Sequence, residues 1–144
     1  MCSSGGHLLL MHQLKPWWEK YERMWVTFPM ADSRSLLRGE RVAWAHHPTT
    51  RNVKNLLRNA ALAWRLVRRA RPSLVVSTGA GVALPFFLVA RVLRIPTVYV
   101  EALERIDTAS LTGRLCYPFS DLFVLQWDEQ RRFFPRGQVI GALY

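Results

Sequence analysis

Cysteine is scarce in this 144-residue sequence, which contains only Cys2 and Cys116. The two do not form a CxxC pair, and no secretory signal peptide accompanies them. Chains with these properties work in a reducing compartment. We therefore expect two free, unreactive thiols in a cytoplasmic protein rather than a disulfide-linked scaffold.

Long hydrophobic runs are also missing. The longest uncharged apolar run, from Val82 to Ala90, has nine residues and contains Pro85, whereas a helix that spans a bilayer needs about 20 residues. The sequence therefore predicts no membrane-spanning segment. Internal repeats and low-complexity linkers are equally absent, so we expect residues 1–144 to form one domain, without a second domain of ordinary size.

Acidic side chains are absent from the middle of the chain. Residues 51–100 carry nine basic and no acidic residues and so account for nearly all of the net charge of +10. Such a surplus favours a phosphate-bearing partner: nucleic acid, an anionic membrane or a phosphorylated small molecule. The sequence has no nucleic-acid-binding motif, and its aromatic residues are not interleaved with basic ones as in a base-stacking surface. We therefore predict no nucleic-acid partner.

Short β-rich runs alternate with longer helical ones along the chain. The expected strands cover residues 24–28, 42–45, 74–77, 97–100, 122–125 and 138–140, and several are apolar throughout, as buried parallel strands are. The expected helices cover residues 8–21, with a break at Pro16, and residues 52–70, 82–93 and 128–134. This alternation predicts an α/β fold with a Rossmann-like open parallel sheet.

Two glycine loops, each placed directly before a helix, are the first candidate site. One contains Ser4, Gly5, Gly6 and His7, and the other runs from Ser77 to Gly81. Small residues in this position leave backbone N–H groups free to bind an anion at the positive end of the helix dipole. A tight connection without a ligand is the alternative. Only Met1 and Cys2 precede the first loop, so we expect its strand to be truncated.

The surplus charge belongs to the helix expected at residues 52–70. Its predicted apolar stripe and the basic side chains expected on its other side suggest two interpretations. Either the helix covers the sheet with a solvated basic face, or it contacts acidic lipid head groups with Trp64 near the interface. The stripe comprises Val53, Leu56, Leu57, Ala60, Trp64 and Val67, and the basic side comprises Lys54, Arg58, Arg65 and Arg69.

The helix expected at residues 82–93 is apolar on nearly every side. Most of its side chains should therefore be buried in the core. One edge is left for contact with lipid or with a partner protein.

Several motifs in order resemble one known family. They read SSGGH from Ser3, STGAG from Ser77, VYVEALER from Val98, SLTGR from Ser110, YPFSD from Tyr117, then Gln126-Trp127 and Ile140-Gly141. Together they resemble the acceptor-side subunit of bipartite UDP-sugar glycosyltransferases. This group includes the bacterial PssD/CpsF-type proteins and the membrane-anchoring subunit of the eukaryotic dolichol-linked UDP-N-acetylglucosamine transferase.

The resemblance implies that this chain corresponds to the N-terminal half of a GT-B glycosyltransferase, similar to that of MurG. A small donor-binding subunit would hold the UDP-sugar, and the chain would be inactive without it. Sugar would pass to a polyprenyl-diphosphate-linked glycan at the inner face of the plasma membrane, in exopolysaccharide, capsule or lipid-linked oligosaccharide synthesis. No metal and no cofactor are implied. The alternative is a non-catalytic scaffold that recruits and activates a separate transferase.

The resemblance also suggests roles for the residues of the two glycine loops. Gly5 and Gly6 would let the backbone approach the acceptor, and Gly79 and Gly81 would form a second acceptor loop. His7 is the candidate general base or the residue that orients the acceptor hydroxyl, with a helix-capping role as the alternative.

Residues after two later strands complete the candidate site. Glu101 is an alternative base, although an internal ion pair between Glu101 and Arg105 is an equally good interpretation; otherwise Arg105 would bind the acceptor. Gln126 and Trp127 would face the partner or the cleft, with packing as the alternative for Trp127. The adjacent His46 and His47 point to opposite sides of an extended segment and do not predict a metal site.

Overall fold

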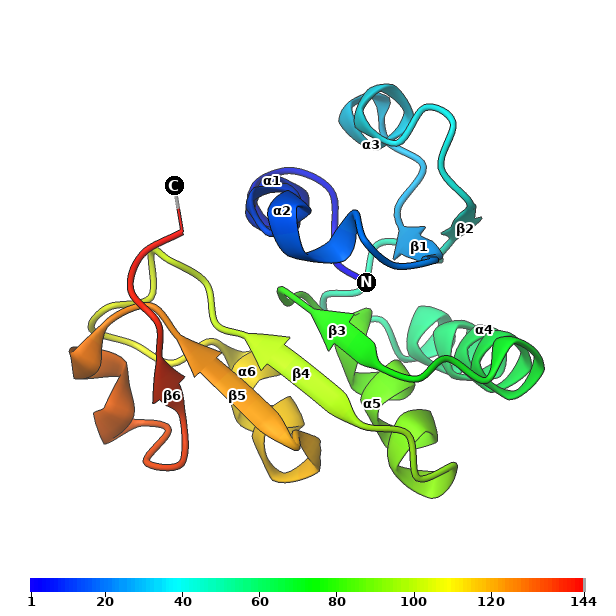
Figure 1. Ribbon diagram of the computed structural model, residues 1–144. Helices are drawn as coiled ribbons and strands as arrows, with labels where there is room; N and C mark the ends of the chain where they lie inside the picture. Colours follow the sequence, from blue (N-terminus) through cyan, green and yellow to red (C-terminus); the bar gives the residue numbers. More distant parts are fainter. Residues whose placement is uncertain (144) are drawn as a thin grey trace.

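The computed structural model describes residues 1–143 and contains six short parallel strands (Figure 1). They are β1 (Trp25–Thr27), β2 (Val42–Trp44), β3 (Val75–Ser77), β4 (Thr97–Val100), β5 (Leu122–Leu125) and β6 (Gln138–Val139). Strand β1 pairs with β2, and the other four form a sheet in the order β3-β4-β5-β6. The register places Val76 beside Val98 and Tyr99 beside Phe123. All six expected strands are confirmed.

The first two residues join the two groups of strands. The backbone N of Cys2 donates a hydrogen bond to the Val26 carbonyl (3.1 Å), and the N of Met1 donates to the Val76 carbonyl (2.6 Å). These residues therefore lie between β1 and β3, in the place that the central strand occupies in a Rossmann sheet. The resulting order across the molecule is β2, β1, residues 1–2, β3, β4, β5 and β6.

Helices cover both faces of these strands. They are α1 (Gly6–Gln13), α2 (Lys15–Trp18), α3 (Ala31–Leu36), α4 (Val53–Ala70), α5 (Ala83–Val92) and α6 (Leu111–Cys116), with 3₁₀ helices η1 (Tyr117–Phe119) and η2 (Asp128–Arg132). Helices α1 to α3 lie on one side and α4 to α6 on the other (Figure 1). The predicted break near Pro16 is confirmed, because α1 ends and α2 begins around Leu14. Helices α3 and α6 were not predicted from the sequence, and the helix expected at residues 128–134 is the 3₁₀ helix η2.

Helix α5 joins two halves of the core. Phe86 packs with residues of β1 and α4, such as Val26 and Leu62, whereas Phe87 packs with Tyr99 and the residues around it. The ring of Tyr99 stacks on Phe123, with centroids 4.9 Å apart. Because α5 supplies buried side chains to both halves, it holds the β3–β6 sheet against α4.

Candidate functional site

The candidate site lies where parallel strands end around residues 1–2. In open α/β sheets, ligands bind beyond the carboxyl ends of the strands at the point where the strand order reverses. Here that point is at residues 1–2, because the chain continues to β1 on one side and later to β3 on the other. The loops at residues 3–5, 28–30, 45–52 and 78–82 follow these strands, and we call the region that they border the crevice, after its place in this type of fold.

His7 ties the two glycine loops together. Its Nδ1 lies 2.7 Å from the Thr78 carbonyl oxygen, and the Thr78 hydroxyl donates to the His7 carbonyl (2.6 Å). A carbonyl oxygen can only accept, so this bond requires the proton on Nδ1 and leaves the Nε2 lone pair as an acceptor. A half-buried imidazole in this tautomer can take a proton from a hydroxyl group that approaches Nε2.

Gly79 is required at the contact between the loops. A Cβ on Gly79 would lie 2.8 Å from His7 Cε1 and 3.1 Å from the Tyr99 hydroxyl oxygen, and its φ of +119° is disfavoured for other residues. The second loop therefore supports the imidazole directly. Gly81 lies against a different segment, because a Cβ there would be 3.0 Å from the Cβ of Thr49.

The first glycine loop donates to a carboxylate. The Gly5 N–H, in a backbone with φ +74°, donates to Asp32 Oδ2 at 2.6 Å, and this bond holds the pKa of the half-buried Asp32 carboxyl below its ordinary value. A Cβ at Gly5 or Gly6 would meet nothing within 4 Å, so the loop borders open space. Ser4, beside it, is half-buried. The sequence analysis missed Asp32, whose signal was an acidic residue in the first turn of a short helix after β1.

Glu101 is buried rather than facing the crevice. It has no exposed surface, its Oε2 accepts from the Ser110 hydroxyl (3.1 Å), and its Oε1 accepts from the Ala102 N–H (3.2 Å). Loss of water contact raises the pKa of this carboxyl above its ordinary value. A Cβ on Gly113 would come within 2.1 Å of Oε2, so α6 packs directly on the carboxylate. In this structure Glu101 therefore fixes α6 and does not reach a substrate.

The expected ion pair between Glu101 and Arg105 is not formed within residues 1–143. The exposed Arg105 guanidinium instead reaches the Thr108 hydroxyl at 3.5 Å. The alternative interpretation of Glu101, as half of an ion pair, is therefore wrong. Arg105 itself is accessible to an anionic ligand.

The prediction that Gln126 faces the partner or the cleft is wrong, because its side chain is 1% exposed. Its Nε2 donates to the Glu101 carbonyl (2.8 Å), and its Oε1 accepts from Leu143 N (3.0 Å). Trp127 is half-buried, and its Nε1 donates to the Leu103 carbonyl (2.9 Å). Gln130, which the sequence analysis missed, is fully buried and donates to the Ala102 and Arg105 carbonyls (both 3.1 Å). These side chains bind the loop after β4 to η2.

The buried face of α4 is not the predicted apolar stripe. Its buried residues are Asn55, Asn59, Leu62, Ala63 and Val67. Three members of the predicted stripe are instead among the most exposed apolar side chains of the helix: Val53 is 69% exposed, Leu57 65% and Trp64 42%. Only Val67 of that stripe is buried. The two asparagines explain the difference. Because they form hydrogen bonds to the loop after β2, their side of the helix faces inward.

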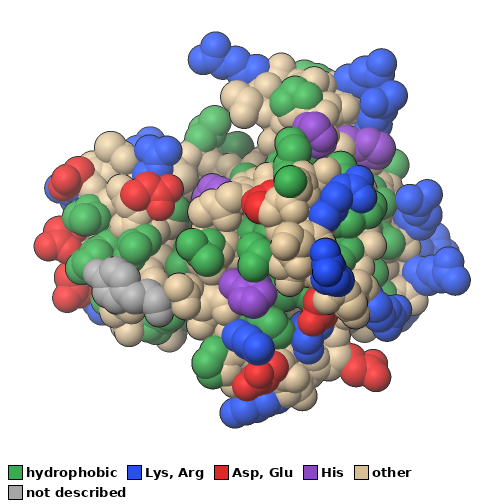
Figure 2. Space-filling view, turned by 90° about the horizontal axis from the view of Figure 1, so that it is seen from above, with side chains coloured by type: hydrophobic (Ala, Val, Ile, Leu, Met, Phe, Trp, Pro, Cys, Tyr) green, Lys and Arg blue, Asp and Glu red, His purple; other side chains and the backbone are tan. Residues whose placement is uncertain are grey.

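The outer face of α4 is therefore both apolar and basic. We use this name for its exposed residues Val53, Lys54, Leu57, Arg58, Trp64, Arg65, Arg68 and Arg69. Figure 2 shows Lys and Arg side chains along the right-hand edge of the molecule, on the side where α4 lies in Figure 1. Arg68 sits 5.8 Å from the Trp64 ring centroid. Leu88 and Val92 of α5 and Leu111 of α6 are exposed as well.

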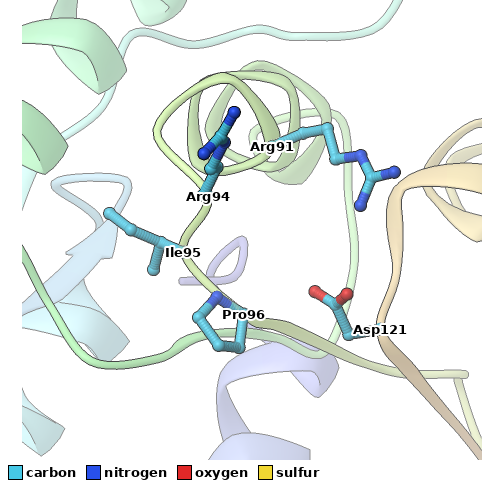
Figure 3. Close-up of a pocket in the computed structure, with 5 residues that line it drawn as sticks. All are labelled: Arg91, Arg94, Ile95, Pro96 and Asp121. Atoms are coloured by element: carbon cyan, nitrogen blue, oxygen red, sulfur yellow. The ribbon is translucent and has the colours of Figure 1, made fainter.

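A depression of about 460 Å³ lies away from the crevice, lined by Arg91, Arg94, Ile95, Pro96 and Asp121 (Figure 3). Pro96 and Asp121 directly precede β4 and β5, so this depression is at the amino ends of the strands. The Asp121 carboxylate accepts from the Thr97 N–H (2.8 Å) and therefore holds the start of β4. None of the candidate site residues lines this depression.

Both cysteines are free and buried, as expected. Burial raises the pKa of Cys2 and brings that of Cys116 to about 12, so neither is a ready nucleophile. Within residues 1–143 no three His, Cys, Asp or Glu side chains are grouped as metal ligands, and no helix is long and apolar enough to cross a membrane.

Comparison with known proteins identifies the family. The family described as "Oligosaccharide biosynthesis protein Alg14 like" matches residues 36–143, three quarters of the sequence. The chain belongs to this Alg14-like family. The match includes the loop after β2, α4, the second glycine loop and every later element, whereas the first glycine loop lies outside it.

Two relatives of this Alg14-like chain are UDP-N-acetylglucosamine transferase subunits ALG14. The protein from Eremothecium gossypii is 41% identical over 103 residues, which are 63% of this chain and 46% of that protein. The human protein is 29% identical over 97 residues, 63% of this chain and 45% of that protein. The aligned part of the chain thus spans a little under half the length of these relatives.

Solved structures share the fold of this Alg14-like chain. MurG from Acinetobacter baumannii superposes with a TM-score of 0.74 and 18% identity, over 90% of this chain and 41% of MurG. UDP-GlcNAc 2-epimerase from Methanocaldococcus jannaschii gives a TM-score of 0.70 and 13% identity, over 94% of this chain and 40% of that protein. The predicted Rossmann-like, GT-B-type fold is confirmed.

Proposed function

We propose that this chain is the acceptor-binding, membrane-facing subunit of a two-part glycosyltransferase. A separate donor-binding subunit would hold the UDP-sugar, and the sugar would pass to a hydroxyl group of a polyprenyl-diphosphate-linked glycan. The bacterial PssD/CpsF-type setting, in exopolysaccharide, capsule or lipid-linked oligosaccharide synthesis, is part of this proposal. The observation that carries it is the Alg14-like match to residues 36–143 of a chain that forms one Rossmann-type unit.

The described unit corresponds in size to one half of a GT-B protein. This chain superposes over 90% of its length on 41% of MurG, which is about the share of one half of a GT-B protein. In a GT-B transferase the reaction takes place between two such halves. We therefore expect the isolated chain to transfer no sugar, and expect the complete active site to form only with the donor-binding subunit.

His7 is the chain's candidate for proton transfer. The tautomer set by Thr78 leaves Nε2 able to accept the proton of the acceptor hydroxyl as its oxygen attacks the anomeric carbon and the bond to UDP breaks. Basic side chains and a helix dipole on the partner would stabilise the departing UDP, so the proposal requires no metal or cofactor.

The outer face of α4 is the proposed membrane contact. Its exposed Trp64 and Leu57 lie beside basic side chains, and such a combination binds the interface of anionic membranes. A lipid-linked acceptor has to be met at this interface. We propose that the protein is cytoplasmic and peripheral on the inner face of the plasma membrane.

The buried position of Glu101 favours a second candidate function. With no exposed surface, this carboxylate cannot act as a base in the described conformation, so His7 is the sole predicted base of this chain that borders the crevice. If the partner supplies the base, this chain is a non-catalytic scaffold that binds the acceptor and recruits the transferase.

Co-expression with the donor-binding subunit tests the proposal. The measurement is transfer from UDP-GlcNAc, and from other UDP-sugars in parallel, to a short-chain polyprenyl-diphosphate-linked sugar. We expect turnover only when both subunits are present. Equal rates for the isolated chain and the pair would contradict the two-part enzyme, and full activity of the pair with His7→Ala would favour the scaffold.

A further inference from the structure

The loop after β2 borders the crevice, but its side chains have no role in the site described so far. Residues 46–50 connect β2 to α4 at the sheet edge where the two glycine loops lie. His46, His47, Pro48 and Thr50 are exposed, and Thr49 is half-buried. Folding alone does not require an exposed loop to have a fixed conformation. Contacts that fix this loop therefore suggest that its conformation serves a function.

Two buried asparagines of α4 hold the backbone of this loop. Asn59 is 1% exposed; its Oδ1 accepts from the His46 N–H (2.8 Å), and its Nδ2 donates to the His46 carbonyl (2.9 Å). Asn55 is 7% exposed, and its Nδ2 donates to the Pro48 carbonyl (3.0 Å). Burying an amide is unfavourable unless it is hydrogen-bonded, and these partners supply the bonds. The loop therefore has one defined conformation.

That conformation places the loop against the second glycine loop. A Cβ on Gly81 would lie 3.0 Å from the Cβ and 3.1 Å from the Oγ1 of Thr49. The His47 ring packs beside Phe28, with centroids 5.6 Å apart, while the side chain stays exposed. Residues 46–50 therefore form a wall of the crevice. They lie beside the second glycine loop, in which Gly79 contacts the His7 ring.

We propose that the loop after β2 binds the diphosphate group of the lipid-linked acceptor through two side chains, with the His47 imidazole and the Thr49 hydroxyl as donors. This inference rests on the proposed function, because it deepens the acceptor site. Ring N–H and hydroxyl donors suit phosphate oxygens, and residues 42–99, which include this loop, carry no acidic side chain. The carboxylate at this edge of the sheet is that of Asp32, which accepts a hydrogen bond from the Gly5 N–H. Asn55 and Asn59 are positioning residues that act through the loop backbone.

NMR of the imidazoles tests the inference directly. The chain has four histidines, so each ring can be assigned by single substitution. Farnesyl diphosphate added to the full chain should shift the ring signals of His7 and His47, whereas His12, packed beside Trp18, serves as the unshifted control.

The outcomes separate this inference from the proposed function. Shifts at His7 without shifts at His47 would overturn the inference and leave the acceptor crevice intact. No shift at either ring would overturn both. UDP is the second probe, because it also carries a diphosphate. Shifts of His47 with UDP and none with farnesyl diphosphate would assign the loop to the donor and overturn the inference.

Matched variants test the individual residues. His47→Ala and Thr49→Val should each weaken farnesyl diphosphate binding by about tenfold, as expected for the loss of one hydrogen bond to a charged group. His46→Ala is the control, because the Asn59 bonds to the His46 backbone remain. Equal losses for His46→Ala and His47→Ala would overturn the assignment of specific donors.

Asn59→Ala tests the positioning role. It should reduce farnesyl diphosphate binding as much as His47→Ala does, while the circular dichroism spectrum stays native. The double variant, with both Asn59→Ala and His47→Ala, should lose little more affinity than either single variant. If Asn59→Ala unfolds, His47→Ala and Thr49→Val still decide the inference, because His47 is exposed and Thr49→Val keeps the shape of the half-buried side chain. Additive losses in a folded double variant would contradict action through the loop.

Discussion

His7 and Gly79, which are 72 positions apart in the sequence, are in contact across the crevice. The imidazole occupies the space that a side chain at position 79 would fill, since a Cβ there would lie 2.8 Å from Cε1 and 2.9 Å from Nδ1. The same Nδ1 is hydrogen-bonded to the carbonyl of Thr78, the preceding residue. The two glycine loops are therefore one structural unit, and a change in either should be felt in the other.

Gly79→Ala should displace the His7 imidazole and greatly reduce sugar transfer. Gly39→Ala is the matched control, because Gly39 also has a positive φ (+87°) but a Cβ there would contact nothing within 4 Å. Both variants should lose about 1 kcal/mol or more of stability from backbone strain. Only Gly79→Ala should also lose activity at a temperature where both are folded. Equal activity of the two folded variants would show that the contact between Gly79 and the His7 imidazole is not needed for sugar transfer.

His7→Ala should lower the turnover of the two-subunit enzyme by roughly 10²- to 10⁴-fold, the usual contribution of a general base. His12→Gln, five residues further along the same helix and packed by its ring against Trp18 and Trp25, should leave turnover nearly unchanged. Single-turnover kinetics would measure the effect, with co-purification to show that the subunits still assemble. Unchanged turnover of His7→Ala would remove His7 from the mechanism.

Asp32→Asn should bind farnesyl diphosphate more tightly. The amide oxygen can still accept from the Gly5 N–H, but the variant lacks the negative charge that repels a phosphate from this loop. We expect a gain of roughly two- to fivefold in affinity, typical of one exposed charge interaction. Glu129→Gln makes the same change of charge at an exposed site after β5 and should have less effect. Weaker binding by Asp32→Asn would show that its charge assists the ligand.

Glu101→Gln should become more stable relative to the wild-type protein as the pH rises. The folded-state pKa of Glu101 is raised by burial, so the native state holds a proton that the unfolded state releases. The stability of the wild-type protein therefore falls as the pH increases from the ordinary carboxyl pKa, about 4.5, through the folded-state pKa of Glu101, whereas Glu101→Gln lacks this loss. Thermal unfolding of both proteins between pH 4 and 8 measures the difference. Parallel stability curves would contradict the pKa shift.

Reversal of Lys54, Arg58, Arg65 and Arg69 to Glu should abolish binding to anionic vesicles. Each basic residue near such a surface contributes about 1 kcal/mol, so the loss should be at least a thousandfold in affinity. Flotation with vesicles that contain phosphatidylserine, compared with neutral vesicles, is the measurement. Reversal of the exposed Arg38 and Arg41, before β2, is the control. Continued binding after reversal on α4 would remove this helix from the membrane contact.

The strands could be predicted from the sequence because their burial pattern is local. Runs such as Leu122–Leu125 are apolar on both faces, which parallel sheets covered by helices require. Helices α3 and α6 were missed because each has only six residues, too few for an apolar period to be recognised. Helix α6 is N-capped by Ser110, whose side chain accepts from the Gly113 N–H, and this Ser-Leu-Thr-Gly signal was visible in the sequence.

The orientation of α4 could not be predicted from its apolar period. Asn55 and Asn59 are polar residues that periodicity assigns to solvent, yet they are buried because a distant loop supplies their hydrogen bonds. The same reason hides Glu101 and Gln126, whose partners lie in other elements. In contrast, the approach of the two glycine loops follows from parallel topology alone, because both loops leave the same sheet edge.

Helix α4 also sets a fixed distance between the loop after β2 and the exposed side chains of its outer face. A helix rises 1.5 Å per residue, so the nine steps from Asn59 to Arg68 span about 14 Å along a stiff helix. One end is bonded to the loop at residues 46–48, and the far end carries Trp64 and Arg68 on the opposite side. Whatever surface these two side chains rest on is thereby kept at a fixed distance from the crevice.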